Sequence, residues 1–284
     1  MPLLIHHSLP QFINLSNLAA PQVRCFSFSF TMFTLYKKEI FSFLNSLIGY
    51  IAVIVFLLIN GLFLWVFPMG FNIIDFGYAS LDNMFSLAPM VFLFLIPAIT
   101  MRSFADEKRS GTIEMLLTKP LTDFQIIFSK YLASITLVLL AVLPTLIYAV
   151  SVYLLGSPKG NLDMGGLWGS YIGLVFLASA FAAIGLFISS ITDNQIVAFM
   201  LSLIICGFLL MGFDIIAGLA LFGKVDLFIM SLGIQAHYTS MSRGVIDSRD
   251  VLYFLSIIAI FLMMTKTALE SRKWENTSSA NKKA

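Results

Sequence analysis

The chain has 284 residues, of which 59% are hydrophobic and 11% are charged, and its formal net charge is +2. A soluble domain is about half apolar and about a quarter charged, so this composition excludes a water-soluble globular protein and predicts an integral membrane protein. The small net charge argues against a nucleic-acid partner, because nucleic-acid binding relies on concentrated positive charge.

Residues 1–31 differ from the sequence that follows. They contain one charge, Arg24, and two prolines, Pro10 and Pro21. A secretory signal peptide needs a basic region before an uninterrupted apolar core, and neither is present. We therefore expect a leader that is either a translated upstream extension or a disordered tail, with Met32 as the native start. N-terminal sequencing of the native protein tests this expectation.

Residues 33–46 predict a short amphipathic helix. Apolar residues recur there at three- and four-residue spacings, and Lys37, Lys38 and Glu39 stand between them. Such a helix would lie in the membrane interface before the first span. An ordinary basic flank of that span remains an equal alternative.

Six later segments are long and apolar enough to cross a bilayer, since a helical span needs about 20 mostly apolar residues. They comprise residues 47–67, 84–101, 132–155, 167–191, 196–213 and 251–269. The predicted fold is therefore an all-α integral membrane protein whose transmembrane domain covers residues 32–272, followed by a polar tail at 273–284. Pro97 and Pro144 are expected to kink two of the spans.

Two polar residues, Asn60 and Asp214, stand out in the apolar segments. A carboxylate inside a span is a functional candidate. Because Asp214 lies near the end of its span, we interpret it as a solvated boundary residue in preference to a proton relay. The apolar stretch at 214–222 is too short for a seventh span and is predicted to be re-entrant or interfacial.

Basic residues are concentrated in three places, which are the flank at 37–38, the loop at 102–130 and the tail from Lys266 onward. With six spans these places fall on one side of the membrane. Cytoplasmic loops carry the excess of lysine and arginine, so both termini and the loop at 102–130 are predicted to be cytoplasmic.

The loop at 102–130 carries the most concentrated charge in the chain. Placing its roughly nine charges at bilayer depth, at about 3 kcal/mol each, would cost about 25 kcal/mol, so the loop must lie outside the membrane. Gly111 is predicted to form a turn before a short helix. Thr122 and Gln125 form a capping box that begins the next helix. A solvated connector remains the alternative to a functional loop.

Residues 102–123 read Arg-Ser-Phe-Ala-Asp-Glu-Lys-Arg-Ser-Gly-Thr-Ile-Glu-Met-Leu-Leu-Thr-Lys-Pro-Leu-Thr-Asp. This run resembles the signature after the second span of ABC-2-type permeases, and nearly every position matches. The segments at 191–198 and 240–247 also resemble their family counterparts. Over residues 32–272 the resemblance is closest to the gliding-motility-associated ABC transporter permease subunit of Bacteroidota, the GldF-like branch.

The resemblance implies the membrane half of an ATP-driven transporter of the bacterial inner membrane, associated with gliding motility or export. The loop at 102–130 would contain a coupling helix that docks on a separate cytoplasmic ATP-binding subunit. A second membrane half is also implied, either another copy or an accessory permease-like subunit. The residues expected to carry docking are Glu107, Arg109, Gly111, Thr112 and Glu114. The charges would bind the ATPase, the glycine would permit the turn, and the threonine would cap the helix that follows.

The sequence contains no Gly-x-x-x-x-Gly-Lys-Ser/Thr phosphate-binding loop, so we expect this chain not to be an enzyme and ATP hydrolysis to come from a partner. Cys25 and Cys206 lie far apart, and His6, His7 and His237 lack metal-ligand spacing. No disulfide framework, metal or cofactor is therefore expected.

Three other classes fit the sequence less well. A non-transporting membrane scaffold that uses ATPase binding for assembly is compatible with the same signature and is the main alternative. An ion-driven secondary transporter would need several buried ionisable residues around a central cavity, and the spans offer at best Asp214. A membrane-embedded enzyme would need a nucleophile and base or a pair of metals, which no spacing indicates.

Overall fold

A computed structural model describes residues 20–68, 70, 72–77, 80–113, 121–219 and 223–281. Every regular element in these ranges is a helix, and six helical segments are long and apolar enough to cross a membrane. They run Leu47–Trp65, Asp82–Arg109, Asp123–Leu155, Met164–Ile191, Gln195–Gly218 and Ser248–Ser271. The prediction of an all-α membrane protein with six transmembrane helices is confirmed.

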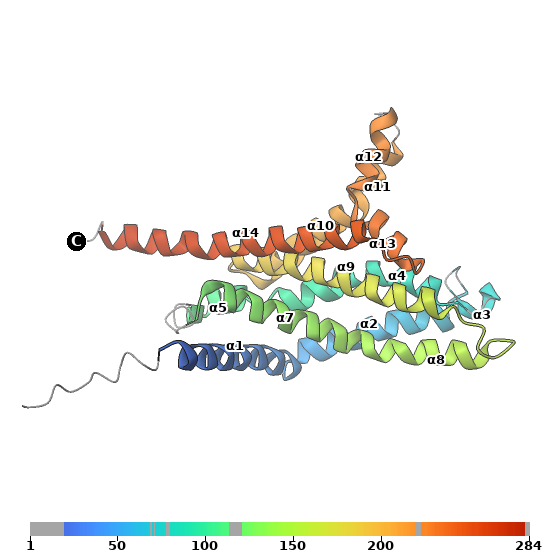
Figure 1. Ribbon diagram of the computed structural model, residues 1–284, viewed down its shortest axis with the longest axis horizontal. Helices are drawn as coiled ribbons and strands as arrows, with labels where there is room; N and C mark the ends of the chain where they lie inside the picture. The colour runs from blue at the N-terminus through green and yellow to red at the C-terminus, as the bar shows by residue number, and fades with distance from the viewer. Residues whose placement is uncertain are drawn as a thin grey trace, which may run out of the picture.

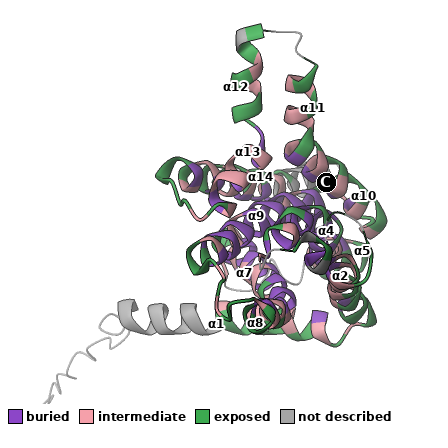
Figure 2. Ribbon diagram, turned by 90° about the vertical axis from the view of Figure 1, so that its right-hand side faces the viewer, coloured by how far each residue is buried: buried purple, intermediate pink, exposed green. Residues whose placement is uncertain are grey.

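Helix α9 lies at the centre of the bundle. Its neighbours are α4 (Asp82–Thr100), α7 (Asp123–Val142), α10 (Gln195–Gly207) and α14 (Ser248–Asn281), which pack around α9 (Met164–Ile191) (Figure 1). The many glycine, alanine and serine residues of α9 explain this position, because small side chains let neighbouring helices approach closely. Figure 2 shows the buried residues gathered along α9 and α4, while the outer helices keep exposed sides.

Helix α1 spans Ala20–Leu44 and packs along α7 before the chain turns into α2 (Leu47–Trp65). Leu35 and Phe43 are buried against the bundle, whereas Phe33 and Phe41 are exposed. The basic segment is therefore a packed helix with one buried and one open side, and not a loose flank. Its location in the membrane interface stays a prediction.

The helix begins earlier than the segment at 33–46 that the sequence predicted. Pro21 is its second residue, where a missing N–H has no effect because the first N–H groups of a helix have no partner within it. Residues 22–31 contain no further proline or glycine, so nothing in them stops the helix. Residues 1–19 lie outside the described part of the chain, and the leader and the start at Met32 stay predictions.

Both singled-out prolines lie within spans. Pro97 is inside α4, together with Pro89. Pro144 lies in a 3-10 turn, Leu143–Thr145, which separates α7 from α8 (Leu146–Leu155). The change of helix type accommodates the missing N–H and the ring of the proline, and the two helices together make the third span.

After the fifth span the chain leaves the bundle. Helix α10 continues through a π-helical segment, Phe208–Gly212, into α11 (Phe213–Gly218), and α12 (Asp226–Ser231) returns. Figures 1 and 2 show α11 and α12 projecting sideways from the bundle as a hairpin. The described part of the stretch at 214–222 is thus part of this hairpin, and Asp214 is partly exposed where the hairpin leaves the bundle.

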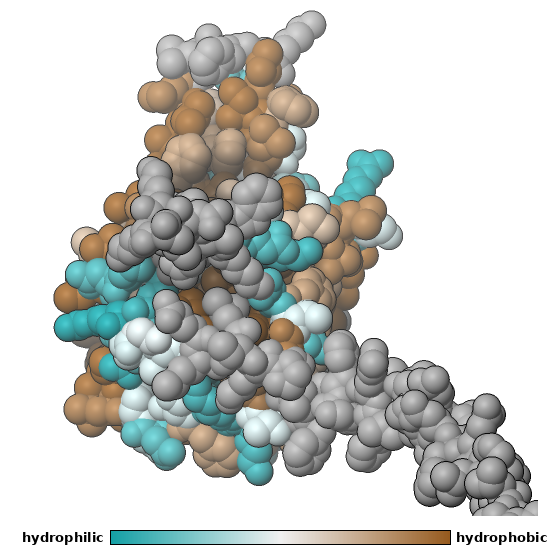
Figure 3. Space-filling view, turned by 90° about the vertical axis from the view of Figure 1, so that its left-hand side faces the viewer, coloured by the Kyte–Doolittle hydropathy of each residue, from teal (hydrophilic) through white to brown (hydrophobic). Residues whose placement is uncertain are grey.

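One end of the bundle is marked by hydrophilic side chains (Figure 3). Helix α5 (Ala105–Arg109) and the C-terminal end of α14 lie at one end, and α3 (Ile73–Phe76) lies at the other (Figure 1). Figure 3 faces the first end and shows hydrophilic side chains gathered there, whereas the flanks and the hairpin are mainly hydrophobic. This distribution is typical of a bundle whose ends reach water and whose sides contact lipid.

Candidate functional site

Helix α5 is the ordered part of the charged loop, and a serine from α9 holds its beginning. Ser189 Oγ accepts hydrogen bonds from the backbone N–H groups of Phe104 and Ala105 at 3.0 and 3.1 Å. The same hydroxyl donates to the Met101 carbonyl at 3.1 Å. The first N–H groups of a helix have no partner within the helix, so here a different span supplies the cap. This buried contact fixes α5 to α9.

A second contact joins α5 to the turn between α9 and α10. Gln195 Nε2 donates to Asp106 Oδ1 at 2.6 Å. Lys108 Nζ lies 3.6 Å from Asp193 Oδ1, and the side chain of Lys108 is only 1% exposed. Two charged stretches that are far apart in the sequence are therefore adjacent in the fold, and each provides partners for the other.

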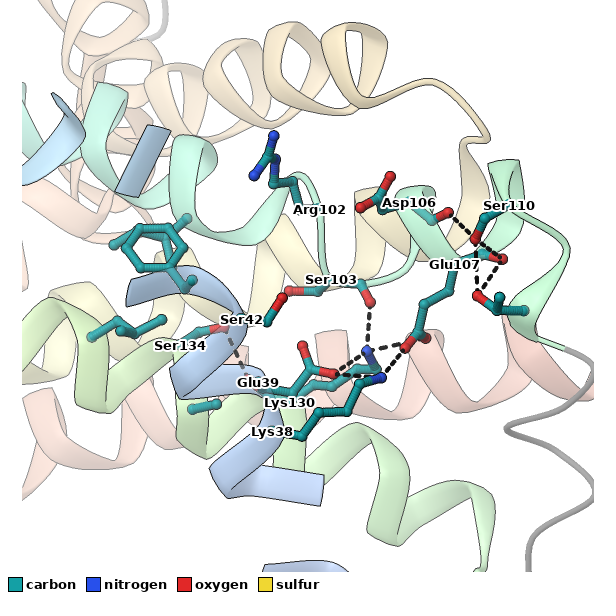
Figure 4. A pocket seen from close by; sticks show the side chains of 15 residues that line it. Lys38, Glu39, Ser42, Arg102, Ser103, Asp106, Glu107, Ser110, Lys130 and Ser134 are labelled. Carbon is teal, nitrogen blue, oxygen red and sulfur yellow. Dashed lines mark hydrogen bonds and ion pairs between the residues drawn. The ribbon is translucent and has the colours of Figure 1, made fainter. Parts of the chain in front are cut away.

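Glu107 of α5 also lies beside three charged side chains of α1 and α7. We call these four residues the Lys130 cluster: Lys130 of α7, Glu107 of α5, and Lys38 and Glu39 of α1 (Figure 4). Lys130 Nζ lies 3.0 Å from Glu39 Oε1 and 3.1 Å from Glu107 Oε2. It also donates a 2.6 Å hydrogen bond to the Ser103 carbonyl. Lys38 Nζ lies 3.5 Å from the other carboxylate oxygen of Glu107.

The Lys130 cluster is electrically balanced and largely removed from water. The side chain of Lys130 is 0% exposed, and those of Glu39 and Glu107 are 17% and 14% exposed. A buried ammonium needs close anions and hydrogen-bond acceptors: Lys130 donates to Glu39 Oε1 and to the Ser103 carbonyl, and the Glu107 carboxylate supplies a second negative charge beside it. Lys130 Nζ also lies 5.1 Å from the centroid of the Phe104 ring. The cluster thereby joins α1, α5 and α7 at one point.

The start of α7 explains how Lys130 is presented to the cluster. Gln125 N donates to Thr122 Oγ1 at 3.4 Å, and Thr122 N donates to Gln125 Oε1 at 2.8 Å. The predicted capping box is confirmed. From this fixed start, about two turns of helix bring Lys130 to the side of α7 that faces α1 and α5.

A cavity of about 240 Å³ lies between α1, α5 and α7 beside the Lys130 cluster (Figure 4). Its lining adds Arg102 and Asp106 to the charged cluster, and apolar side chains such as Phe43 and Leu137. Among the described residues no His, Cys, Asp and Glu side chains are grouped as a metal site would require. The arrangement can bind helices to one another through charge-assisted hydrogen bonds, and it leaves polar groups open to water.

The five residues expected to dock an ATPase do not share one environment. Glu107 is engaged in the Lys130 cluster, whereas Arg109 is exposed. Gly111 is exposed with a φ of +70°, which confirms the predicted turn because the left-handed region favours glycine. Thr112 Oγ1 lies 2.9 Å from Ser110 Oγ and donates to the Glu107 carbonyl at 3.4 Å. Glu114 lies outside the described residues.

Most of the helix expected after Thr112 falls on residues 114–120, which lie outside the described residues. The role of Thr112 as its cap stays a prediction. The Thr112 and Ser110 hydroxyls both donate hydrogen bonds to backbone carbonyl groups of α5. These bonds close the C-terminal end of α5 and fold the chain back at Gly111.

The third family-like segment, residues 240–247, packs on the beginning of α9. Ser170 Oγ donates to the Ser242 carbonyl at 2.7 Å. Gly244 has a φ of +83°, and a Cβ on it would lie 3.0 Å from Gly166 Cα. A Cβ on Gly169 would lie only 2.5 Å from Gly244 Cα. The backbone of α9 and that of residues 240–247 are therefore in direct contact, and glycine is required at both Gly169 and Gly244.

A family of proteins described as ABC-2 family transporter protein matches residues 67–275 of this sequence. The match covers most of the chain and includes α5, the α9–α10 turn and the glycine contact at the start of α9. The chain belongs to the ABC-2 transporter family. No curated protein sequence matches it significantly.

This ABC-2 family protein is therefore the membrane component of a transporter and a multi-pass membrane protein. The membrane domain of such a transporter does not itself hydrolyse ATP, and members of the family generally pair with ATP-binding subunits. The Lys130 cluster and the Ser189 cap are consequently structural parts of a permease.

Sequence reasoning did not assign roles to Glu39, Lys130 and Ser189 in this permease. A usable signal existed for Lys130, because a lysine at the start of an apolar span requires an acidic partner or a route to water. The sequence did not identify that partner, because Glu39, Asp106, Glu107 and Asp123 were all available acids. No signal existed for Ser189, since serines in apolar helices commonly bond their own backbone.

Proposed function

We propose that this permease docks a separate cytoplasmic ATP-binding subunit through α5 and the rest of the loop at 102–130, and that α5 transmits the movement of that subunit to the spans. The observation that carries the proposal is the anchoring of α5 on several sides, by Ser189 of α9, Gln195 at the start of α10 and Lys130 of α7. A short helix held in this way does not shift alone. A force on its open side therefore reaches several spans together.

Within this proposal the charged residues of α5 have separate roles. Asp106 and Glu107 bond other parts of the permease and position α5. Arg109 is exposed and borders a surface groove formed with the α9–α10 turn, where Ile196 and Val197 are 72% and 49% exposed. An arginine beside exposed apolar side chains is a typical centre of a protein–protein interface. We therefore propose Arg109 as a direct contact with the ATP-binding subunit.

Thr112 and Glu114 remain proposed parts of the same docking surface, and Gly111 provides the turn that presents it. Glu107 is unsuitable for testing docking by charge reversal. A lysine there would place a further cation beside Lys38 and Lys130, and the permease itself would be damaged. Among the described residues Arg109 forms no such internal ion pair, so its substitution tests docking directly.

Arg109→Glu is expected to weaken binding of the ATP-binding subunit at least about tenfold, equivalent to about 1.4 kcal/mol, because an interfacial charge is reversed. Membrane insertion and yield should not change. Tagged full-length permease would be purified from native membranes at low and high salt, and the bound subunit measured by mass spectrometry and by ATP hydrolysis.

The matched control is Lys159→Glu, which reverses an exposed charge outside the loop at 102–130 and should leave binding unchanged. A double variant, Arg109→Glu with Glu114→Lys, should show the strongest loss. Full association of the double variant would contradict docking through this loop.

We also propose that both termini and α5 lie in the cytoplasm and that the membrane is the bacterial inner membrane, supported by the basic residues near 37–38, 102–130 and 266–273. In a variant lacking the natural cysteines, a membrane-impermeant thiol reagent applied to intact, outer-membrane-permeabilised cells should label Lys159→Cys and spare Arg109→Cys. The opposite labelling pattern would reverse the orientation.

The finer assignment to gliding motility or export is a proposal supported by the resemblance of residues 102–123, 191–198 and 240–247. It includes a second membrane half, either another copy of this chain or an accessory permease-like subunit. Purification of the native complex identifies that half directly. Reconstitution in vesicles then separates a transporter from a scaffold, because a scaffold would assemble in an ATP-dependent manner without moving any compound across the membrane.

A further inference from the structure

A second polar contact lies where the α11–α12 hairpin joins the bundle. His237, on α13 (Ile234–Ser242), has its Nδ1 2.7 Å from Asp250 Oδ1 at the start of α14. Its Nε2 lies 2.9 Å from the Ser231 carbonyl at the end of α12. The imidazole stacks on Tyr253, with ring centroids 3.9 Å apart. The Tyr253 hydroxyl in turn donates to the Leu232 carbonyl at 2.6 Å.

Both partners of His237 are hydrogen-bond acceptors. A neutral imidazole carries one N–H, so one of its nitrogens would face an oxygen with a lone pair. The imidazolium carries an N–H on each nitrogen and satisfies the carbonyl and the carboxylate together. The geometry of this contact therefore requires two protons on the ring nitrogens or shared with Asp250.

The surroundings of Asp250 add a second argument for the protonated form. Its side chain is 8% exposed, and its Oδ2 atom is buried without a hydrogen-bond partner among the described residues. An ionised carboxylate in such a place needs a counter-charge. Among the described ion pairs, the one that Asp250 makes is with His237. The stacked ring of Tyr253 also favours a cation above it.

The elements that pack on α13 bring few titratable groups to this contact. Helix α14 brings Arg249, Asp250 and Tyr253, α12 brings Asp226, α9 brings Tyr171, and the π-helical segment brings none. Helix α11 brings Asp214, whose Oδ1 would lie 3.7 Å from a Cβ placed on Gly233 at the start of α13. Within the described part of the chain, Asp250 and Tyr253 are the members of this set that are hydrogen-bonded to or stacked on the imidazole.

We propose that His237 is a proton-dependent latch that ties the α11–α12 hairpin to the bundle. In the protonated state the ring links the Ser231 carbonyl of α12 to Asp250 of α14. Loss of a proton removes one of these hydrogen bonds and leaves the buried carboxylate without its cation, so the base of the hairpin loosens. The latch is therefore closed while both ring nitrogens hold a proton and opens when one of these protons is lost.

The hairpin controlled by this latch is strongly apolar on its surface. Ile215, Leu227 and Phe228 are 63%, 77% and 64% exposed. It projects from the bundle across the direction of the spans (Figure 1), near the end opposite to α5. The pH on that side of the membrane would then set how firmly this apolar arm is held. The proposal does not depend on docking of an ATP-binding subunit at α5.

Hydrogen–deuterium exchange of the full-length protein in lipid nanodiscs tests the latch. After correction for intrinsic exchange, the backbone amides of residues 226–234 should exchange at least about tenfold faster at about pH 8 than at about pH 5.5. His237→Gln should exchange rapidly at both values and lose the pH dependence. Tyr253→Phe, which keeps the stacked ring and removes its hydroxyl, should retain the pH dependence.

Asp250→Asn tests the latch independently, because it removes the carboxylate charge and leaves His237 in place. Its amides at 226–234 should also lose most of the pH dependence. In each variant the amides of α9 should exchange as in the wild type, which establishes that the bundle is folded. Equal exchange of the wild type at both pH values, or a pH dependence that persists in His237→Gln, would overturn the latch.

Discussion

Replacing Lys130 with methionine is expected to lower the free energy of unfolding by about 3–5 kcal/mol, because two carboxylates would lose their shared cation in a site with little access to water. Glu39 and Glu107 lie 3.0 and 3.1 Å from the Lys130 ammonium and are less than one-fifth exposed. Methionine fills a similar volume, so the loss reports the charge and not a cavity. The measurement is an SDS titration of the detergent-solubilised protein, followed by circular dichroism.

Two further variants make the Lys130 prediction specific. Lys37→Met removes an exposed lysine of α1 whose described contact is with the Phe41 ring, and it should change stability by less than about 0.5 kcal/mol. Combining Lys130→Met with Glu39→Gln and Glu107→Gln removes all three charges together. This triple variant should recover most of the lost stability, since neutral side chains need no counter-charge. Equal effects of Lys130→Met and Lys37→Met would contradict the role of the cluster.

Gly244→Ala is expected to destabilise the protein by about 2–4 kcal/mol. About 1–2 kcal/mol comes from placing a side chain at a positive φ, which is +83° here. The remainder comes from overpacking, because the new Cβ would lie 3.0 Å from Gly166 Cα, and backbone cannot rotate away as a side chain can. The same SDS titration measures the change.

Gly207→Ala is the matched control for Gly244→Ala. Gly207 is the last residue of α10, has an ordinary helical φ of −63°, and has open space where a Cβ would be placed. Alanine there should be neutral or stabilise the helix by up to about 1 kcal/mol. If Gly207→Ala and Gly244→Ala were equally well tolerated, the close contact between α9 and the segment after α13 would not contribute to stability.

The features predicted correctly from the sequence are local ones. Each span must satisfy its backbone hydrogen bonds within a single helix, so length and hydropathy of the segment suffice to predict it. The capping box at Thr122 and Gln125 and the turn at Gly111 likewise depend on residues a few positions apart. The family match to residues 67–275 agrees with the resemblance of the charged loop, whose residues are also contiguous.

The contacts that hold α5 could not be predicted in the same way. Lys130 and Glu39 are 91 positions apart, and Ser189 and Phe104 are 85 positions apart. Nothing in the local pattern says which span lies beside which. For the same reason the sequence pattern predicted that Glu107 and Arg109 would both contact the ATP-binding subunit. The structure instead places the Glu107 carboxylate in the Lys130 cluster and leaves the Arg109 guanidinium exposed.

The sequence alone determined that this is a multi-pass membrane protein with six segments long and apolar enough to cross the membrane, and it predicted that the charged loop lies outside the bilayer. These conclusions follow from transfer free energies, which belong to each segment separately. Only the tertiary structure decided which charges of that loop hold α5 against α1, α7, α9 and α10, and which remain open to a partner. That division depends on distances between helices, because a charge is favourable in a buried place only when its partner is brought beside it.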